Sequence, residues 1–234
     1  SKMFNITLPM NFDSPYKAVS IRDFWKRWHM SLTKFFTKYI YIPLGGSKKG
    51  EFFTYLNTMI IFLISGIWHG AAYTFILWGL MHGVMMCLER PLRERLEKIP
   101  RSIRWAVTFF LVNIAWVFFR APSLDDALVF LKSLFSFNYL PPDMSLVAAA
   151  TPEELQIIQW LILTTGNRTP YIEGCIMVLS FLAFALFASV LMKNTNERIR
   201  DFKPTRAMLS LTVLLLVWSI ISLSDVSGFI YVNF

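Results

Sequence analysis

The fold is decided by one long apolar stretch, residues 52–87, which reads FFTYLNTMIIFLISGIWHGAAYTFILWGLMHGVMMC. A helix that crosses a membrane needs about 20 mainly apolar residues, with a range of about 17–25. The stretch holds 36 residues, too many for one such helix, and small residues interrupt it near Ser65-Gly66 and at Gly70. We therefore predict a hairpin of two short membrane helices, with spans near 52–66 and 70–88.

The composition of the whole chain favours an integral membrane protein. Of 234 residues, 55% are hydrophobic and only 16% are charged, yet the net charge is +8. A soluble domain carries roughly 25% charged residues. A soluble enzyme is therefore excluded, and three more apolar runs predict spans near 103–119, 171–192 and 207–223. The expected fold class is all-α, a polytopic transmembrane helical bundle.

The charges outside the apolar runs predict how the chain is oriented. Residues 1–51 hold nine basic and three acidic residues, residues 89–104 six and three, and residues 193–206 five and two, whereas residues 120–170 hold three and five. The positive-inside rule places the three basic segments in the cytoplasm and residues 120–170 in an external loop. This pattern works only if residues 52–87 cross twice. The excess charge is thus an orientation signal, and the expected partner is the lipid bilayer, with no nucleic acid.

Residues 21–40, within the segment 1–51, show a helical period without being a span. Aromatic and aliphatic side chains recur on one helical face, namely Ile21, Phe24, Trp25, Trp28, Leu32, Phe35, Phe36 and Tyr39. Basic side chains lie on the opposite face, namely Lys26, Arg27, Lys34 and Lys38. This pattern predicts one amphipathic helix at the cytoplasmic interface.

The three histidines are the main candidates for chemistry. An ionisable residue at membrane depth is costly and indicates a functional site, and histidine exchanges protons near neutral pH. His69 lies in Gly66-Ile67-Trp68-His69-Gly70, where it acts either in catalysis or in a packing hydrogen bond between helices. For His29, a place at the membrane interface and a functional role are equally favoured. His82 is interpreted as structural. No Cys/His cluster has metal-ligand spacing, so no metal is expected.

Several motifs resemble the membrane-bound O-acyltransferase family and, within it, the bacterial alginate O-acetyltransferase branch. They are Asn11-Phe12-Asp13-Ser14-Pro15-Tyr16, Asp23-Phe24-Trp25-Lys26-Arg27-Trp28-His29, Tyr39-Ile40-Tyr41-Ile42-Pro43-Leu44-Gly45-Gly46, the segment from Ser65 to Gly83, and Trp116-Val117-Phe118-Phe119-Arg120. The resemblance covers nearly all of the chain but only the C-terminal half of such an enzyme. It implies that residues 1–234 are the C-terminal portion of one membrane domain.

The resemblance also implies a function. His69 matches the family's catalytic histidine and would act as general base on an acceptor hydroxyl, while His29 would orient or polarise the acyl group. No bound cofactor is implied, and the acyl donor is acetyl-CoA or an acetylated carrier. The acetyl group would pass toward an exported polysaccharide such as alginate, with periplasmic or extracellular polysaccharide-acetylation proteins as partners, from a multi-pass protein of the bacterial inner membrane.

Three alternatives remain open on the sequence. A sister enzyme would transfer another group, such as D-alanine to teichoic acid, or use another acceptor, such as peptidoglycan. A transporter would use His69 in a proton relay, which broken helices also favour. Finally, this length of chain is inactive if further helices are needed to close the site.

Overall fold

A computed structural model describes residues 8–136, 170–200 and 204–222. The chain divides into two compact units, residues 1–139 and 140–234, and each is considered by itself. The described residues form helices and no strand, which confirms the all-α class. Most of the predicted external loop, residues 137–169, and the last residue of the span near 207–223 lie outside the described residues.

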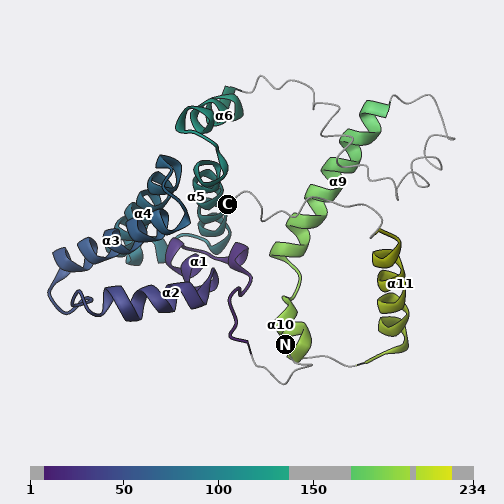
Figure 1. The fold of residues 1–234 in the computed structure, drawn as a ribbon, viewed down its shortest axis with the longest axis horizontal. Coiled ribbons are helices and arrows are strands. Elements are labelled where there is room, and N and C mark those ends of the chain that lie inside the picture. Colours follow the sequence, from purple (N-terminus) through teal and green to yellow (C-terminus); the bar gives the residue numbers. More distant parts are fainter. Residues whose placement is uncertain (1–7, 137–169, 201–203, 223–234) are drawn as a thin grey trace. The chain divides into compact units, whose positions relative to one another are not determined.

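The predicted hairpin is present. Helix α3 (Glu51–His69) and helix α4 (Tyr73–Glu97) lie side by side, joined by residues 70–72 (Figure 1). The helix runs unbroken through Ser65-Gly66 and ends at His69, where the Gly70 N–H donates to the Ile67 carbonyl. The first helix is therefore one turn longer than predicted, and its break falls directly after His69.

Glycines let the two helices approach closely. A Cβ on Gly66 would collide with the Phe75 carbonyl oxygen, and a Cβ on Gly79 would collide with the Phe62 carbonyl oxygen. Because the obstructing atoms belong to the backbone, a side chain there requires the helices to move apart. The small residues thus serve the close packing that they provide in membrane helix pairs.

Three further predicted spans coincide with helices: α5 (Arg101–Arg120), α9 (Pro170–Val190) and α11 (Arg206–Ser222). In the first unit α5 packs on α4 and is followed by the shorter α6 (Leu124–Ser136), whereas α9, α10 (Thr195–Arg200) and α11 belong to the second unit. Within the described ranges, α3 and α5 are long and apolar enough to cross a membrane. That all five helices cross it stays a prediction.

The prediction of a single amphipathic helix over residues 21–40 is wrong. The chain forms, after a short turn η2 (Pro15–Lys17), two short helices α1 (Ile21–Arg27) and α2 (Met30–Phe36) and a π-helical turn η3 (Thr37–Tyr41). His29 has φ 44° and ψ 53°, the left-handed conformation that an α-helix of L-residues does not continue through. The apolar positions on either side of His29 therefore belong to two helices with separate faces.

Helix α1 packs along α4. The backbone N–H of Ile21 donates to the Glu89 carboxylate at 2.6 Å, and the Trp25 indole donates to His82 at 3.2 Å. Glu89 and His82 lie seven residues apart, or about two helical turns. Helix α1 therefore runs along α4 toward the turn between α3 and α4. His29 follows α1 at the end nearest that turn.

Candidate active site

His69 lies inside a group of aromatic side chains from three helices. Its half-buried imidazole has ring-centroid distances of 4.8 Å to Trp68, 4.9 Å to Phe119, 5.3 Å to Trp78 and 6.3 Å to Phe75. We call these four residues the aromatic cage. Helices α3, α4 and α5 each contribute to it, so the cage exists only when the hairpin and α5 are packed together.

Three members of the aromatic cage pack against one another. Trp78 is 1% exposed and packs against Phe119 at 5.1 Å, while Phe119 in turn contacts Phe75 at 5.0 Å. Such edge-to-face pairs contribute about 0.5–1.5 kcal/mol each beyond their buried area. The imidazole of His69 is thereby held against apolar ring surfaces, and no hydrogen bond to it is present among the described residues.

His29 approaches the same place from the N-terminal segment. Its ring lies 6.4 Å from the Trp68 ring, and Trp68 lies 4.8 Å from His69, so one indole contacts both imidazoles. The buried Nδ1 atom of His29 has no hydrogen-bond partner within the described ranges. The structure thus brings together both histidines that were predicted to be catalytic.

Asn11 holds the turn that presents His29. Its backbone carbonyl accepts from the Met30 N–H at 2.9 Å, and its side-chain oxygen accepts from the N–H and hydroxyl of Ser31 at 3.0 and 2.7 Å. On the other side of the turn the Asp13 N–H donates to the Arg27 carbonyl at 2.9 Å. These bonds flank His29 and stabilise its left-handed conformation.

His82 lies in the packed interior and contacts Trp78, one member of the aromatic cage. It is completely buried, its Nδ1 accepts from the Trp25 indole, and its ring packs against Trp78 at 5.1 Å and Phe62 at 6.1 Å. Its Nε2 is buried without a hydrogen-bond partner among the described residues. The complete burial and the ring contacts on several sides favour the structural interpretation.

The sequence pattern does not mark Asn11, Trp78 or Phe119 as parts of the site. Asn11 had an available signal, because asparagine side chains bond backbone groups near turns. Trp78 and Phe119 had none, because aromatic residues in apolar runs look like ordinary core. Within the described residues no group of three or more His, Cys, Asp and Glu side chains could hold a metal ion.

Tyr16 is a titratable group beside the site and outside the predicted spans. Its ring packs against Phe109 at 5.7 Å, and its carbonyl accepts from the Trp105 indole at 2.8 Å. Burial raises the pKa of the Tyr16 phenol above its usual value, and the Trp116 side chain partly opposes this rise. The phenol therefore stays neutral at physiological pH.

The part of the chain that matches known proteins includes every residue of this site. The model of the membrane-bound O-acyltransferase family matches residues 3–124, slightly more than half of the chain. A peptidoglycan O-acetyltransferase of Helicobacter pylori is 38% identical over 237 residues, which are 99% of this chain and 44% of the relative. A probable alginate O-acetylase of Azotobacter vinelandii is 45% identical over 129 residues, 55% of this chain and 26% of the relative.

A more distant relative carries a different name. A teichoic acid D-alanyltransferase of Bacillus subtilis is 33% identical over 93 residues, 37% of this chain and 24% of that protein. The chain spans less than half the length of each of these three relatives. The matched residues 3–124 contain both histidines, Asn11 and the entire aromatic cage. The resemblance seen in the motifs is thus confirmed: the chain belongs to the membrane-bound O-acyltransferase family.

Proposed function

We propose that the protein is a membrane O-acyltransferase that moves an acetyl group onto a hydroxyl of an exported cell-surface glycan. One observation carries the proposal. His29 and His69 are forty residues apart in sequence, yet both contact Trp68, inside the region that the family model matches. Both histidines are half-buried, and titratable groups that meet in this way away from any ion pair are typical of catalytic sites.

His69 acts as the general base in this proposal. Its neutral imidazole takes the proton of the acceptor hydroxyl while the hydroxyl oxygen attacks the acyl carbon. The bond from that carbon to the donor's leaving sulfur breaks, and the proton passes from His69 to the departing thiolate. A positioned general base contributes about 10²–10⁴ in rate.

In this proposal His29 donates a hydrogen bond to the oxygen of the acyl carbonyl. Its Nδ1 is buried, which leaves Nε2 as the ring nitrogen for a substrate, and in the tautomer that carries a proton on Nε2 it donates to an acyl carbonyl oxygen. A donor fixed in place before the reaction stabilises the negative charge that develops on that oxygen. The bonds from Asn11 around the turn supply the fixed position.

The donor and acceptor follow from the chemistry and from the relatives' names. Acetyl-CoA or an acetylated carrier brings the acetyl group from the cytoplasmic side. The relative that matches along 99% of the chain is named for peptidoglycan, while the alginate relative matches along 55%. We therefore place peptidoglycan ahead of alginate as acceptor. The proposal includes a multi-pass location in the bacterial inner membrane and partners that complete glycan acetylation outside it.

The test is acetyl transfer by the purified full-length protein in lipid vesicles. Labelled acetyl-CoA is the donor, and peptidoglycan fragments and alginate oligomers are compared as acceptors, with D-alanine transfer to teichoic acid assayed in parallel. We expect His69→Ala to lower transfer about 10²–10⁴-fold and His29→Ala about 10²–10³-fold, with unchanged thermal unfolding.

The control variant is Tyr73→Phe, which removes a hydroxyl at the start of α4, where the side chain is 76% exposed. It should leave transfer unchanged. Undiminished transfer in His69→Ala would refute the catalytic assignment. Proton movement across the vesicle that depends on His69, without any acylated product, would instead favour the transporter.

A further inference from the structure

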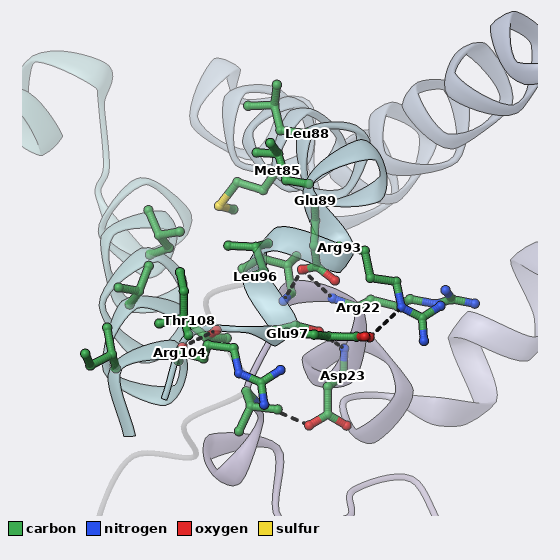
Figure 2. Close-up of a pocket in the computed structure, with 18 of the residues that line it drawn as sticks. Arg22, Asp23, Met85, Leu88, Glu89, Arg93, Leu96, Glu97, Arg104 and Thr108 are labelled. Atoms are coloured by element: carbon green, nitrogen blue, oxygen red, sulfur yellow. Dashed lines mark hydrogen bonds and ion pairs between the residues drawn. The ribbon is translucent and has the colours of Figure 1, made fainter. Parts of the chain in front are cut away.

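A groove lies away from His29 and His69. Its volume is about 450 Å³, and it lies between the start of α1, the C-terminal half of α4 and the first half of α5 (Figure 2). We call it the α1–α4–α5 groove. Neither His29, His69 nor any residue of the aromatic cage lines it, so the proposed chemistry leaves it unexplained.

One side of the groove is an apolar wall from two helices. Its members are aliphatic side chains of α4 and α5, among them Met85, Leu88, Leu92, Leu96, Ile103 and Val107. From Met85 to Leu96 the wall extends along eleven residues of α4, or about 17 Å at 1.5 Å per residue. Met85, Leu88, Ile103 and Val107 lie in the predicted spans, whereas Leu92 and Leu96 lie in the segment 89–104 that is predicted to be cytoplasmic. The wall therefore runs from the membrane interior to the cytoplasmic interface.

The opposite end of the groove is polar, and its carboxylates are all engaged. Asp23 pairs with Arg27 at 2.8 Å, and Glu97 pairs with Arg93 at 2.9 Å. Glu89 accepts the backbone N–H groups of Ile21 and Arg22, at 2.6 and 3.2 Å, and so caps α1. Glu89 receives only backbone N–H groups, so its negative charge remains, and the four cations of the lining exceed its three carboxylates by one charge.

Three cations of the groove remain without a carboxylate among the described residues: Arg22, Lys26 and Arg104. The Nε of Arg104 is buried and has no hydrogen-bond partner there. Figure 2 shows Arg104 near the end of the groove opposite Leu88 and Met85. The groove therefore offers positive charge at one end and a continuous hydrocarbon wall at the other.

We propose that the α1–α4–α5 groove binds one anionic phospholipid of the cytoplasmic leaflet. Its phosphate interacts with Arg104, Lys26 and Arg22, and one acyl chain lies along the wall of α4 and α5. A small anion leaves the wall uncovered, and so does an acetyl group, whose chain has only one methyl. The distribution of Lys and Arg predicts that this end of the bundle faces the cytoplasm, where anionic lipids attract basic residues.

The bound lipid would also brace the segment that carries His29. Its headgroup contacts α1 and its chain contacts α4 and α5, so it joins α1 to α4, as Glu89 does through the cap on α1, and adds α5. Binding itself, however, is independent of the proposed acyl transfer. The test below uses no catalytic readout, and its failure would leave the proposed function untouched.

The test is photo-crosslinking on the purified full-length protein in phosphatidylcholine nanodiscs that contain a photoactivatable phosphatidylglycerol. We expect labelled peptides from residues 85–111, and we expect unlabelled phosphatidylglycerol to compete with the label. Each cation near the headgroup contributes about fivefold, so the double variant Lys26→Gln/Arg104→Gln should lose roughly 25-fold in competition affinity. The matched control, Arg95→Gln/Lys98→Gln, removes two cations outside the groove and should change nothing.

A second pair of variants tests the wall and guards against misfolding. Val107→Trp fills the groove at a position that is 52% exposed and leaves every cation in place, so it should abolish the label. Phe110→Trp adds an indole to the same helix outside the groove and should retain the label. All variants should unfold at the same temperature as the parent protein.

Three outcomes would overturn the proposal. Equal labelling by a phosphatidylcholine probe would show that charge plays no part. Competition by inorganic phosphate alone would indicate a small-anion site. Absence of the lipid label, together with crosslinks from the groove to another segment of the full-length chain, would show that a protein segment occupies the groove.

Discussion

Replacing His82 by alanine should unfold the protein at a much lower temperature without removing its chemistry. The substitution leaves the Trp25 indole N–H buried without its acceptor, which costs about 1–3 kcal/mol. It also opens a cavity among Trp78, Phe62 and Phe24, which costs about 2–4 kcal/mol. The sum, about 3–7 kcal/mol, corresponds to a fall in Tm of roughly 10 °C or more for a chain of this size.

His82→Asn separates the two contributions. An asparagine side-chain oxygen lies close to the position of the imidazole Nδ1, so it restores an acceptor for Trp25 while leaving part of the cavity. We expect it to recover about 1–2 kcal/mol relative to alanine. The measurement is thermal unfolding of the detergent-solubilised full-length protein, followed by tryptophan fluorescence, with acetyl transfer measured well below the Tm of each variant.

Two results would refute this reasoning. If His82→Ala unfolds at the parent temperature, the buried hydrogen bond and ring contacts do not support the core. If His82→Ala abolishes transfer while its Tm is unchanged, His82 acts in the chemistry, and the assignment of roles among the three histidines is wrong. A low Tm combined with transfer within a few fold of the parent protein, measured on the folded fraction, is the expected outcome.

Three further predictions concern the same unit. Asn11→Ala should lower transfer at least tenfold, because it frees the turn at His29 and removes bonds worth about 1–2 kcal/mol. Asn11→Asp should retain transfer, because its carboxylate still accepts from the Ser31 N–H and hydroxyl. Equal loss of transfer in both variants contradicts this reasoning. Gly79→Ala should lower the Tm, since its Cβ meets the Phe62 carbonyl, and an unchanged Tm would disprove the close packing. In an ultraviolet pH titration, the phenol that ionises at the highest pH should be absent from the variant Tyr16→Phe. Because its folded pKa is raised, its contribution to stability is present below a pH of about 10 and is lost as the pH rises further; titration with the exposed tyrosines would contradict the burial.

The hairpin could be predicted because its signals are local. A charge-free run of residues 52–87 cannot remain in water, and its length requires two helices. The position of the break was predicted within one turn. The error arose because Gly66 looked like a breaker, whereas in the structure it provides room for the backbone of Phe75.

The N-terminal segment shows where the helical period of apolar residues fails to predict the structure. The apolar positions of residues 21–40 fit one helix, and nothing in that pattern reveals a residue with positive φ. The left-handed conformation of His29 is held by Asn11, eighteen residues earlier, and the direction of α1 is set by Glu89 and His82, sixty or so residues later. Interactions over such separations override local helical preference.

The sequence by itself therefore determined the all-α class, the hairpin, the family and the identity of the two candidate histidines. Each of these rests on residue type and on spacing within one segment. Only the tertiary structure decided that His29 and His69 meet at Trp68, that His82 belongs to the core, and that three cations and an apolar wall share one groove. The physical reason is that these arrangements depend on how α1, α4 and α5 pack, and packing joins residues that no local pattern relates.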